Sequence, residues 1–162
     1  MTERFHDIAL RVNGEVVHER VDARCTLVDF LRETLNLTGS HVGCEHGFCG
    51  ACTVLLDGAI VRGCLTLAVQ CDGATVETIE GVSDSSAIAD LQDAFQNRNA
   101  LQCGFCTPGM LLTAAALLAA GGVPSREQIR EHLSGNYCRC TGYHAIVDAV
   151  ESVAQARAGK RP

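Results

Sequence analysis

The sequence has almost no lysine and no surplus of basic residues. Its single lysine is Lys160, and its 162 residues carry a formal net charge of −6. Because binding to a phosphate backbone requires clustered Lys and Arg, this balance argues against nucleic acid as a partner. The sequence also lacks the Gly-Lys-Ser/Thr of a P-loop, and no Gly-x-Gly-x-x-Gly follows a predicted strand. We therefore expect no nucleotide cofactor on this chain.

Long apolar segments are missing as well. Residues 1–7 lack the apolar run of a signal peptide, and the most apolar stretch, residues 110–120, is too short to cross a bilayer. Cysteine, in contrast, is abundant, with ten residues. Without an export signal, this number indicates a reducing compartment, where thiolates favour metals over disulfides. The sequence therefore predicts a cytoplasmic protein with no membrane insertion.

Strand patterns dominate the first half of the sequence. Two hairpins are predicted, with turns at Asn13-Gly14 and Asp57-Gly58, and a further short strand is expected at residues 75–79. Between the hairpins, Thr26 can cap one helix. The apolar face of that helix consists of Leu27, Phe30, Leu31 and Leu35. One helix packed on a small mixed sheet predicts an α+β fold, with a plant-ferredoxin-like β-grasp domain over residues 1–80.

Helical patterns dominate residues 81–162. We predict helices over about 85–97, from Thr107 as N-cap to Gly121-Gly122, from the capping box at Ser125 to about Gly135, and over about 142–156. Residues 158–162 are expected to form a frayed tail. The helices form two hairpins, and each hairpin has a cysteine pair just before its second helix. This layout predicts a C-terminal four-helix bundle with pseudo-twofold symmetry, in which the two cysteine pairs meet.

The first cysteine group has the spacing of an iron–sulfur site. Its members are Cys44, Cys49, Cys52 and Cys64. A tight C-x4-C-x2-C loop with a more distant fourth thiolate is the plant-type 2Fe–2S pattern. Zinc is the main alternative, but structural zinc sites usually bring two short-spaced pairs. A Rieske centre is excluded because the sequence has no C-x-x-H segment, and His46 is expected to be a solvated loop residue.

The second cysteine group consists of two pairs. They are Cys103 with Cys106 and Cys138 with Cys140. Each pair precedes a predicted helix, whose N-terminal N–H groups and partial positive charge would face an anionic cluster. A C-x-C pair is unusual for structural zinc, yet spacing alone leaves zinc as an alternative to iron–sulfur here. The first group favours a second 2Fe–2S cluster, and two clusters in one chain would form an electron relay.

Three segments together resemble one known family. They are Gly43-Cys-Glu-His-Gly-Phe-Cys-Gly-Ala-Cys-Thr-Val54, Gln102-Cys-Gly-Phe-Cys-Thr-Pro-Gly-Met110 and Asn136-Tyr-Cys-Arg-Cys-Thr-Gly-Tyr143. In this order they closely resemble the small iron–sulfur subunit of the molybdenum hydroxylases, the family of xanthine dehydrogenase, aldehyde oxidase and carbon monoxide dehydrogenase. Thr78-Ile79-Glu80-Gly81 is similar to that family's connector between domains. The resemblance extends from about residue 5 to residue 155.

This resemblance implies an electron-transfer subunit of an oxidoreductase complex. The partners would be a large molybdopterin subunit and a medium FAD subunit, in a heterotrimer or a dimer of heterotrimers. Substrate would be hydroxylated at molybdenum with water as the oxygen source. Electrons would then pass through the C-terminal cluster, which would be deeply buried beside its partner, and the N-terminal cluster to FAD. The form of the first loop looks more like that of the three-subunit members, which contain FAD.

The resemblance also implies roles for individual residues. Gln102 and Cys140 match the positions that approach the pterin, so no catalytic residue is expected on this chain itself. Arg139 would meet either a dinucleotide tail of the pterin or an acidic partner surface. The substrate would be selected by the molybdenum subunit, so this sequence does not name it.

Two other functions remain open on the sequence alone. One is a zinc-stabilised interaction module without a redox role, and the other is a stand-alone 2Fe–2S redox sensor. In a sensor, Cys25 or Cys71 would be the signalling thiol. Otherwise both are expected to be buried structural thiols, since free cysteine is commonly a small core residue. The pterin-facing motif at Gln102 and the lack of a basic DNA-binding patch weaken the sensor hypothesis.

Overall fold

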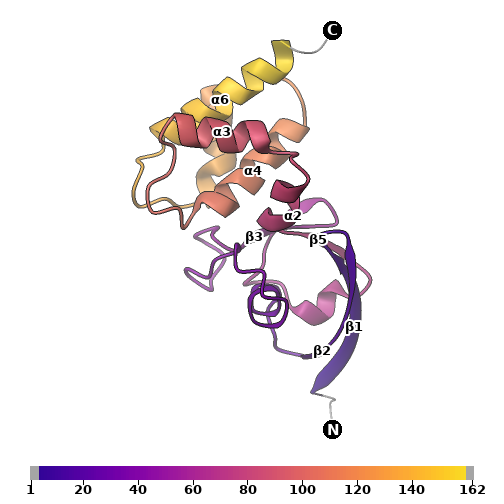
Figure 1. The fold of residues 1–162 in the computed structure, drawn as a ribbon. Helices are drawn as coiled ribbons and strands as arrows, with labels where there is room; N and C mark the ends of the chain where they lie inside the picture. The colour runs from indigo at the N-terminus through magenta and orange to yellow at the C-terminus, as the bar shows by residue number, and fades with distance from the viewer. Residues whose placement is uncertain (1–3, 160–162) are drawn as a thin grey trace.

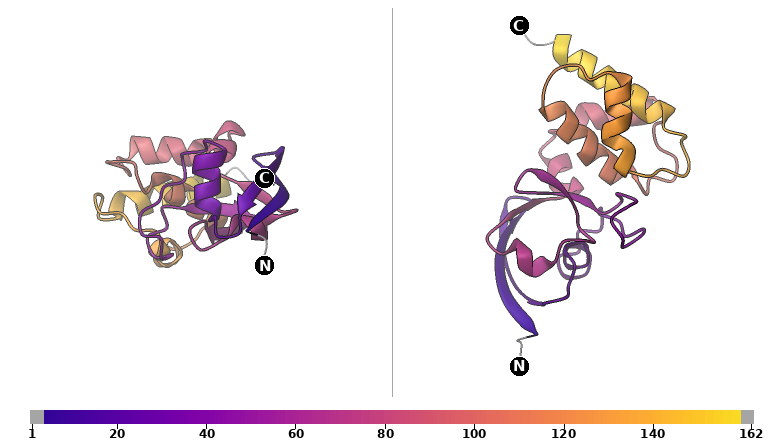
Figure 2. Two further views of the ribbon diagram at one scale, coloured as in Figure 1. Left: turned by 90° about the horizontal axis from the view of Figure 1, so that it is seen from below. Right: turned by 180° about the vertical axis from the view of Figure 1, so that it is seen from behind.

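A computed structural model describes residues 4–159 of the chain. The chain forms two halves, a sheet with its short helical segment and then a group of helices, which follow one another along a long axis (Figure 1). The two ends of the described chain lie far apart along this axis, and the view from behind shows the same separation (Figure 2). Each half has its own hydrophobic cluster, one formed between Ile8 and Val76 and the other between Ile79 and Ala154.

The first half is built on a five-stranded sheet. Its strands are β1 (Phe5–Val12), β2 (Glu15–Asp22), β3 (Thr53–Leu56), β4 (Ala59–Arg62) and β5 (Thr75–Glu77). The strand order is β2-β1-β5-β3-β4, with β1 and β5 parallel and the other neighbours antiparallel. A mixed sheet followed by helices confirms the predicted α+β class. The strand expected at residues 75–79 is present but ends at Glu77, because a helix begins at Ile79.

Both predicted hairpins are present, and their turns have the expected geometry. Asn13 and Gly14 connect β1 to β2 with φ angles of 50° and 89°. Asp57 and Gly58 connect β3 to β4 with φ angles of 49° and 80°. Left-handed backbone at both central residues is the type I′ conformation, which matches the twist of the paired strands. The second turn brings the chain back beside the start of β3 and so returns Cys64 toward the cysteine-rich loop.

The helix predicted between the hairpins is short and changes type. α1 (Leu27–Asp29) runs directly into a π-helical turn, η1 (Phe30–Thr34). Thr26 is the N-cap, as predicted, because the Asp29 N–H donates to the Thr26 Oγ1 at 3.2 Å. Leu27, Phe30 and Leu31 are fully buried in the first hydrophobic cluster. A 3-10 turn, η2 (Ala68–Cys71), completes this half.

The second half is helical. It contains α2 (Ile79–Asp84), α3 (Ala89–Asn97), α4 (Thr107–Ala119), α5 (Arg126–His132), η3 (Leu133–Gly135) and α6 (His144–Gly159). The helix predicted over 85–97 begins only at Ala89, and the unpredicted α2 precedes it. The predicted capping box at Ser125 is confirmed. Residues 158 and 159 belong to α6 rather than to a frayed tail, and residues 160–162 of that tail lie outside the described residues.

The junction between the halves is fixed by the turn of the first hairpin. The Thr78 N–H donates to Asn13 Oδ1 at 2.8 Å, and the Asn13 Nδ2 donates to Thr78 Oγ1 at 3.0 Å. A Cβ at Gly81 would lie 2.4 Å from Asn13 Oδ1, so this contact requires glycine. α2 runs across the predicted boundary at residues 80 and 81, and its Ile79 and Val82 belong to the second hydrophobic cluster.

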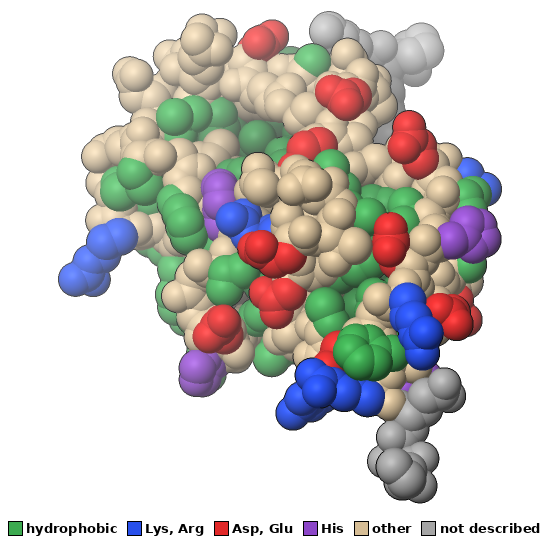
Figure 3. Space-filling view, turned by 60° about the horizontal axis from the view of Figure 1, so that its bottom comes forward, with side chains coloured by type: hydrophobic (Ala, Val, Ile, Leu, Met, Phe, Trp, Pro, Cys, Tyr) green, Lys and Arg blue, Asp and Glu red, His purple; other side chains and the backbone are tan. Residues whose placement is uncertain are grey.

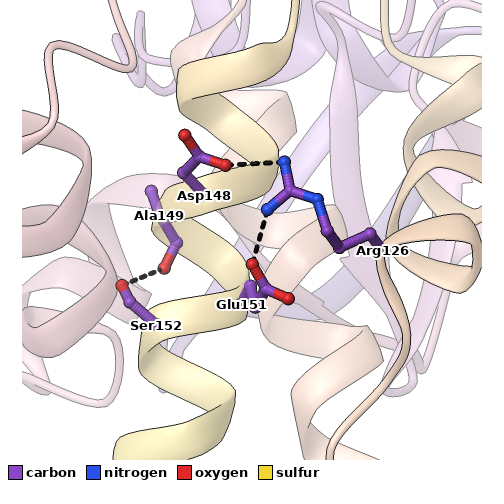
Figure 4. Close-up of polar contacts among 5 residues, drawn as sticks. All are labelled: Arg126, Asp148, Ala149, Glu151 and Ser152. Carbon is purple, nitrogen blue, oxygen red and sulfur yellow. Dashed lines mark hydrogen bonds and ion pairs between the residues drawn. The ribbon is translucent and has the colours of Figure 1, made fainter.

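Ion pairs tie α6 to its neighbours. Arg126, the first residue of α5, donates to Asp148 at 2.7 Å and to Glu151 at 2.5 Å, both on α6 (Figure 4). Arg157, near the end of α6, pairs with Asp90 of α3 at 2.8 Å. The guanidinium groups beside Asp90 and Asp148 hold the pKa of both carboxyls below the usual range. Because these pairs are partly exposed, each contributes little to stability.

The surface is mixed in charge. On the face drawn in Figure 3, basic side chains lie among acidic ones and form no continuous basic area. Apolar side chains also reach this face in several places. Between residues 4 and 159, no helix is both long and apolar enough to cross a membrane.

Candidate metal centres

The first centre is built by one loop and one hairpin. Cys44, Cys49 and Cys52 lie on the loop between η1 and β3, and Cys64 follows β4. The antiparallel pairing of β3 with β4 extends one residue beyond both strands, since the Gly63 N–H donates to the Cys52 carbonyl at 3.0 Å. Cys64 therefore reaches the side of Cys52, as the spacing predicted.

Backbone N–H groups of the loop point at its first thiol. The N–H groups of Cys49 and His46 both lie 3.4 Å from Cys44 Sγ. These donors, with that of Cys49 the strongest, lower the pKa of Cys44 to about 6. Gly47 and Gly50 have φ angles of 79° and 73°, which glycine adopts without strain and which the loop needs to turn its N–H groups inward. The loop thus favours the thiolate that a metal requires.

The thiols of the first centre lie close enough to influence one another's ionisation. Burial, followed by the neighbouring Cys44 thiol, raises the pKa of Cys49. Burial, followed by the neighbouring Cys64 thiol, raises the pKa of Cys52 to about 11. Cys52 is the buried thiol of this centre, and Cys44, Cys49 and Cys64 are half-buried. Because metal ligands are thiolates and the pKa of Cys52 is raised, metal binding here releases protons.

Thiols from two separate turns meet in the second centre. The Sγ atoms of Cys103 and Cys140 lie 3.6 Å apart, and Cys138 lies near enough to Cys106 to influence its ionisation. The topology brings a C-x-x-C turn and a C-x-C turn together, as the layout of the helices predicted. Burial raises the pKa of Cys106 to about 12. Cys103 and Cys140, in contrast, are exposed at the surface of the chain.

Side-chain hydroxyl groups support the C-x-C turn of the second centre. The Thr141 Oγ1 donates to Cys138 Sγ at 3.1 Å, and the Thr141 N–H lies 3.4 Å from the same sulfur. Burial opposes ionisation of Cys138, but these donors outweigh it, and the pKa of the thiol is lowered. The Tyr143 hydroxyl accepts from the Cys138 N–H at 2.9 Å. Both residues lie within the third motif, although no role was predicted for their hydroxyl groups.

The helix ends near the second centre differ in detail from the prediction. Cys106, not Thr107, is the N-cap of α4, and Pro108 lies in the first turn. α6 begins only at His144, so a short loop separates it from Cys140. Of the two cysteine pairs, only the one at Cys106 directly adjoins a helix start. At the other pair, Thr141 supplies the donors that the helix end was expected to supply.

The donor set of each centre tests which group the thiols fit. Each centre offers four cysteine thiols, and N–H or O–H groups donate to Cys44 Sγ in the first and to Cys138 Sγ in the second. A 2Fe–2S cluster is held by four thiolates, and hydrogen bonds to sulfur tune its potential. The residues of both centres therefore fit a 2Fe–2S cluster.

Comparisons with known proteins agree with this donor set. Residues 78–151 match the family of the 2Fe-2S binding domain. The small subunit of nicotine 6-hydroxylase from Paenarthrobacter nicotinovorans is 56% identical over 144 residues, covering 89% of this chain and 87% of the relative. The gamma subunit of caffeine dehydrogenase from Pseudomonas sp. strain CBB1 is 50% identical over 151 residues, covering 91% and 90%. The chain is an iron–sulfur subunit of the molybdenum hydroxylase family.

The solved structures place the iron–sulfur subunit in the same family. A chain of quinoline 2-oxidoreductase from Pseudomonas putida 86 superposes with a TM-score of 0.90 at 50% identity and covers 98% of both chains. Membership overturns the hypothesis of a zinc-stabilised module without a redox role. The subunit belongs to an oxidoreductase complex in which another subunit carries out the substrate chemistry.

The two centres of the iron–sulfur subunit are directly connected. The Tyr137 N–H donates to the Cys49 carbonyl at 2.8 Å, which joins the residue before Cys138 to a cysteine of the first centre. Beside this contact, the His41 ring stacks on Phe105 with centroids 4.5 Å apart. His41 precedes the first loop, and Phe105 lies between the cysteines of the second C-x-x-C turn. The two cysteine loops therefore pack against each other.

Gln102 has a defined contact within this chain. Its Nε2 donates to the Cys140 carbonyl at 3.0 Å, so it links the two turns of the second centre. Gln102, Arg139 and Cys140 are all exposed. Their surface position is compatible with the expected approach to a pterin on another subunit, which stays a prediction.

The remaining predicted residues lie away from the cysteine pairs. Cys71 is fully buried, as expected of a structural thiol, whereas Cys25 is only half-buried. Burial raises the pKa of both thiols. His46 is exposed, as predicted, and its Nδ1 contacts the Cys44 carbonyl. Arg62 and Asn136 lie at the contact between the two halves. Asn136 opens the third motif, but no spacing predicted a role for either residue.

Proposed function

We propose that this subunit passes electrons from a molybdopterin centre on a large partner subunit, through its two centres, to FAD on a medium partner subunit. The proposal rests on one observation: two four-cysteine centres lie in one chain and are joined by the hydrogen bond from Tyr137 to Cys49. A 2Fe–2S cluster supplies one-electron transfer, at a potential tuned by burial, charge and hydrogen bonds to sulfur. Cys44, Cys49, Cys52 and Cys64 would hold one cluster, and Cys103, Cys106, Cys138 and Cys140 the other.

The exposure of the second centre supports the proposed direction. Cys103, Cys140 and the adjacent Gln102 are all exposed. The exposed apolar side chains Leu101, Phe105 and Tyr137 lie in the same segments. Such a surface is typical of one that a partner subunit covers. We assign it to the molybdopterin subunit, with Gln102 and Cys140 nearest the pterin and the second centre deeply buried in the complex.

The first centre would face FAD. Two large apolar side chains next to its ligands, Phe48 and Leu65, are 67% and 63% exposed. They support a second partner surface at this end of the relay. The complex would be a heterotrimer or a dimer of heterotrimers in the cytoplasm.

The proposal includes a finer description of the fold. Residues 1–80 would be a plant-ferredoxin-like β-grasp domain and residues 81–162 a helical 2Fe–2S domain. In the latter, α3 with α4 and α5 with α6 would be two hairpins related by a pseudo-twofold axis. The separate hydrophobic clusters of the two halves support this division.

The decisive experiment replaces one ligand of the first centre in the co-purified complex. With Cys49→Ser, substrate should still reduce the molybdenum centre, whereas stopped-flow flavin reduction should fall below detection. Cys25→Ser, which removes a thiol outside both centres, is the control and should leave both steps unchanged. Flavin reduction at the wild-type rate in the Cys49→Ser complex would refute the proposed order.

A further inference from the structure

Arg62 places a positive charge at the contact between the two centres. It is the last residue of β4, and its Nη1 donates to Thr53 Oγ1. Its Nη2 donates to the Gly135 carbonyl at 2.8 Å and lies 3.4 Å from Asn136 Oδ1. All three acceptors are neutral oxygens. The ion pairs formed within residues 4–159 involve Arg4, Arg24, Arg126 and Arg157, so no carboxylate there neutralises Arg62.

The partners of Arg62 adjoin ligands of both centres. Thr53 follows Cys52 directly, and Arg62 itself is followed by Gly63 and Cys64. Gly135 and Asn136 come just before Tyr137 and Cys138 of the second centre. The guanidinium group therefore lies where the two cysteine sites meet. Each site combines four thiolates and is anionic when it holds a cluster.

The guanidinium group is held in place by a buried polar network. Asn136 is 1% exposed, accepts from Thr113 Oγ1 at 3.0 Å and donates to the Gly50 carbonyl at 3.2 Å. Thr53 Oγ1 donates to the same carbonyl at 2.6 Å. A Cβ at Gly135 would lie 2.7 Å from Arg62 Nη2, so the chain leaves room only for the guanidinium.

We propose that Arg62 is the positioning residue that holds a fixed cation between the two clusters, favours their reduced states and fixes their relative position. The proposal rests on the relay function above. Reduction makes a cluster more negative, and a nearby positive charge stabilises that state. Arg62 also spans the contact between the loops, because its two N–H arms bind different halves of the chain.

The test compares a change of charge with a change of shape. Both variants are made in the full-length chain with its clusters loaded. Arg62→Gln removes the positive charge but retains an amide donor. Arg62→Lys retains the charge but loses the two-armed guanidinium group. The potentials of both clusters are measured by redox titration followed by electron paramagnetic resonance. Arg157→Gln, which makes the same change in net charge at the far end of α6, is the matched control.

We expect Arg62→Gln to lower both potentials by about 59 mV, a tenfold change in each reduction equilibrium constant. Arg62→Lys should retain most of the wild-type potentials, and Arg157→Gln should match the wild type. Unmoved potentials in Arg62→Gln, or an equal fall in Arg62→Lys, would overturn the inference. If Arg62→Gln does not hold its iron, Arg62→Lys decides alone, since a fall of both potentials in that variant contradicts a role of the charge. A wild-type protein without 2Fe–2S signals would instead refute the proposed function.

Discussion

The two centres have the same number of thiols but obtain their geometry in different ways. In the first, one continuous loop supplies three cysteines, and the donors to Cys44 Sγ are backbone N–H groups. In the second, two separate turns meet through helix packing, and a donor to Cys138 Sγ is the hydroxyl of Thr141. A local loop can therefore be predicted from spacing, whereas the second site depends on tertiary structure.

The centres differ in exposure as well. Cys52 of the first centre is 2% exposed, whereas Cys103 and Cys140 of the second lie at the surface. The other three cysteines of the first centre are half-buried, as are Cys106 and Cys138 of the second. The second centre therefore leaves two of its cysteines exposed on this chain, whereas the first leaves none.

The largest expected effect is the selective loss of one cluster. Cys64→Ala should abolish the paramagnetic resonance signal of the first cluster, and Cys106→Ala that of the second, because each removes one thiolate from one centre. Each variant should lose about half of its iron. Loss of all iron in either variant would show that the two centres do not assemble independently, and Cys71→Ala should retain both signals.

The next effect concerns the packing of the first loop against the helical half. A Cβ at Gly50 would lie 2.5 Å from the Gly135 carbonyl, whereas a Cβ at Gly58 meets nothing within 4 Å. Both glycines have positive φ angles, of 73° and 80°. Gly58→Ala should cost about 1–2 kcal/mol of unfolding free energy from backbone strain alone.

Gly50→Ala should cost a further 1–3 kcal/mol or so, because the added methyl group also overpacks the contact between the halves. Denaturant unfolding of the two variants measures the difference. Equal losses of unfolding free energy in both variants would mean that the contact of the loop with Gly135 accommodates the methyl group without cost.

The smallest expected effect distinguishes a hydroxyl group from a backbone N–H group as the donor to a cysteine sulfur. Thr141→Val removes the hydroxyl that donates to Cys138 Sγ and should lower the potential of the second cluster by roughly 30 mV, about threefold in the reduction equilibrium constant. Thr141→Ser keeps the hydroxyl and should restore the potential. The first cluster should not respond, since its donors are backbone groups. A shift of both potentials in Thr141→Val would contradict this assignment.

Local signals predicted much of the fold and of the site. Asn13-Gly14 and Asp57-Gly58 form type I′ turns because both positions need left-handed backbone, and Thr26 caps its helix through a local hydrogen bond. α2 was missed because it is short and is held by burial of Ile79 and Val82 and by the contacts of Asn13 with Thr78. Such contacts join residues far apart in sequence.

Contacts between residues far apart in sequence also explain why some residues near the two sites could not be predicted. The cysteines of both groups were found from spacing and resemblance, since ligands recur at short intervals. Arg62 and Asn136 become neighbours only after the halves pack, and no periodicity indicates that contact. Polar residues that lie between two sites can therefore be identified only from the structure.

The contact between Tyr137 and Cys49 has a consequence for biosynthesis. The carbonyl groups of Cys49 and Gly50 accept hydrogen bonds from Tyr137 and Asn136, which lie near the other end of the chain. Domains begin to form from the N-terminus while the ribosome still adds residues. The hydrogen bonds that complete the first cysteine loop can therefore form only after residue 137 has left the ribosome.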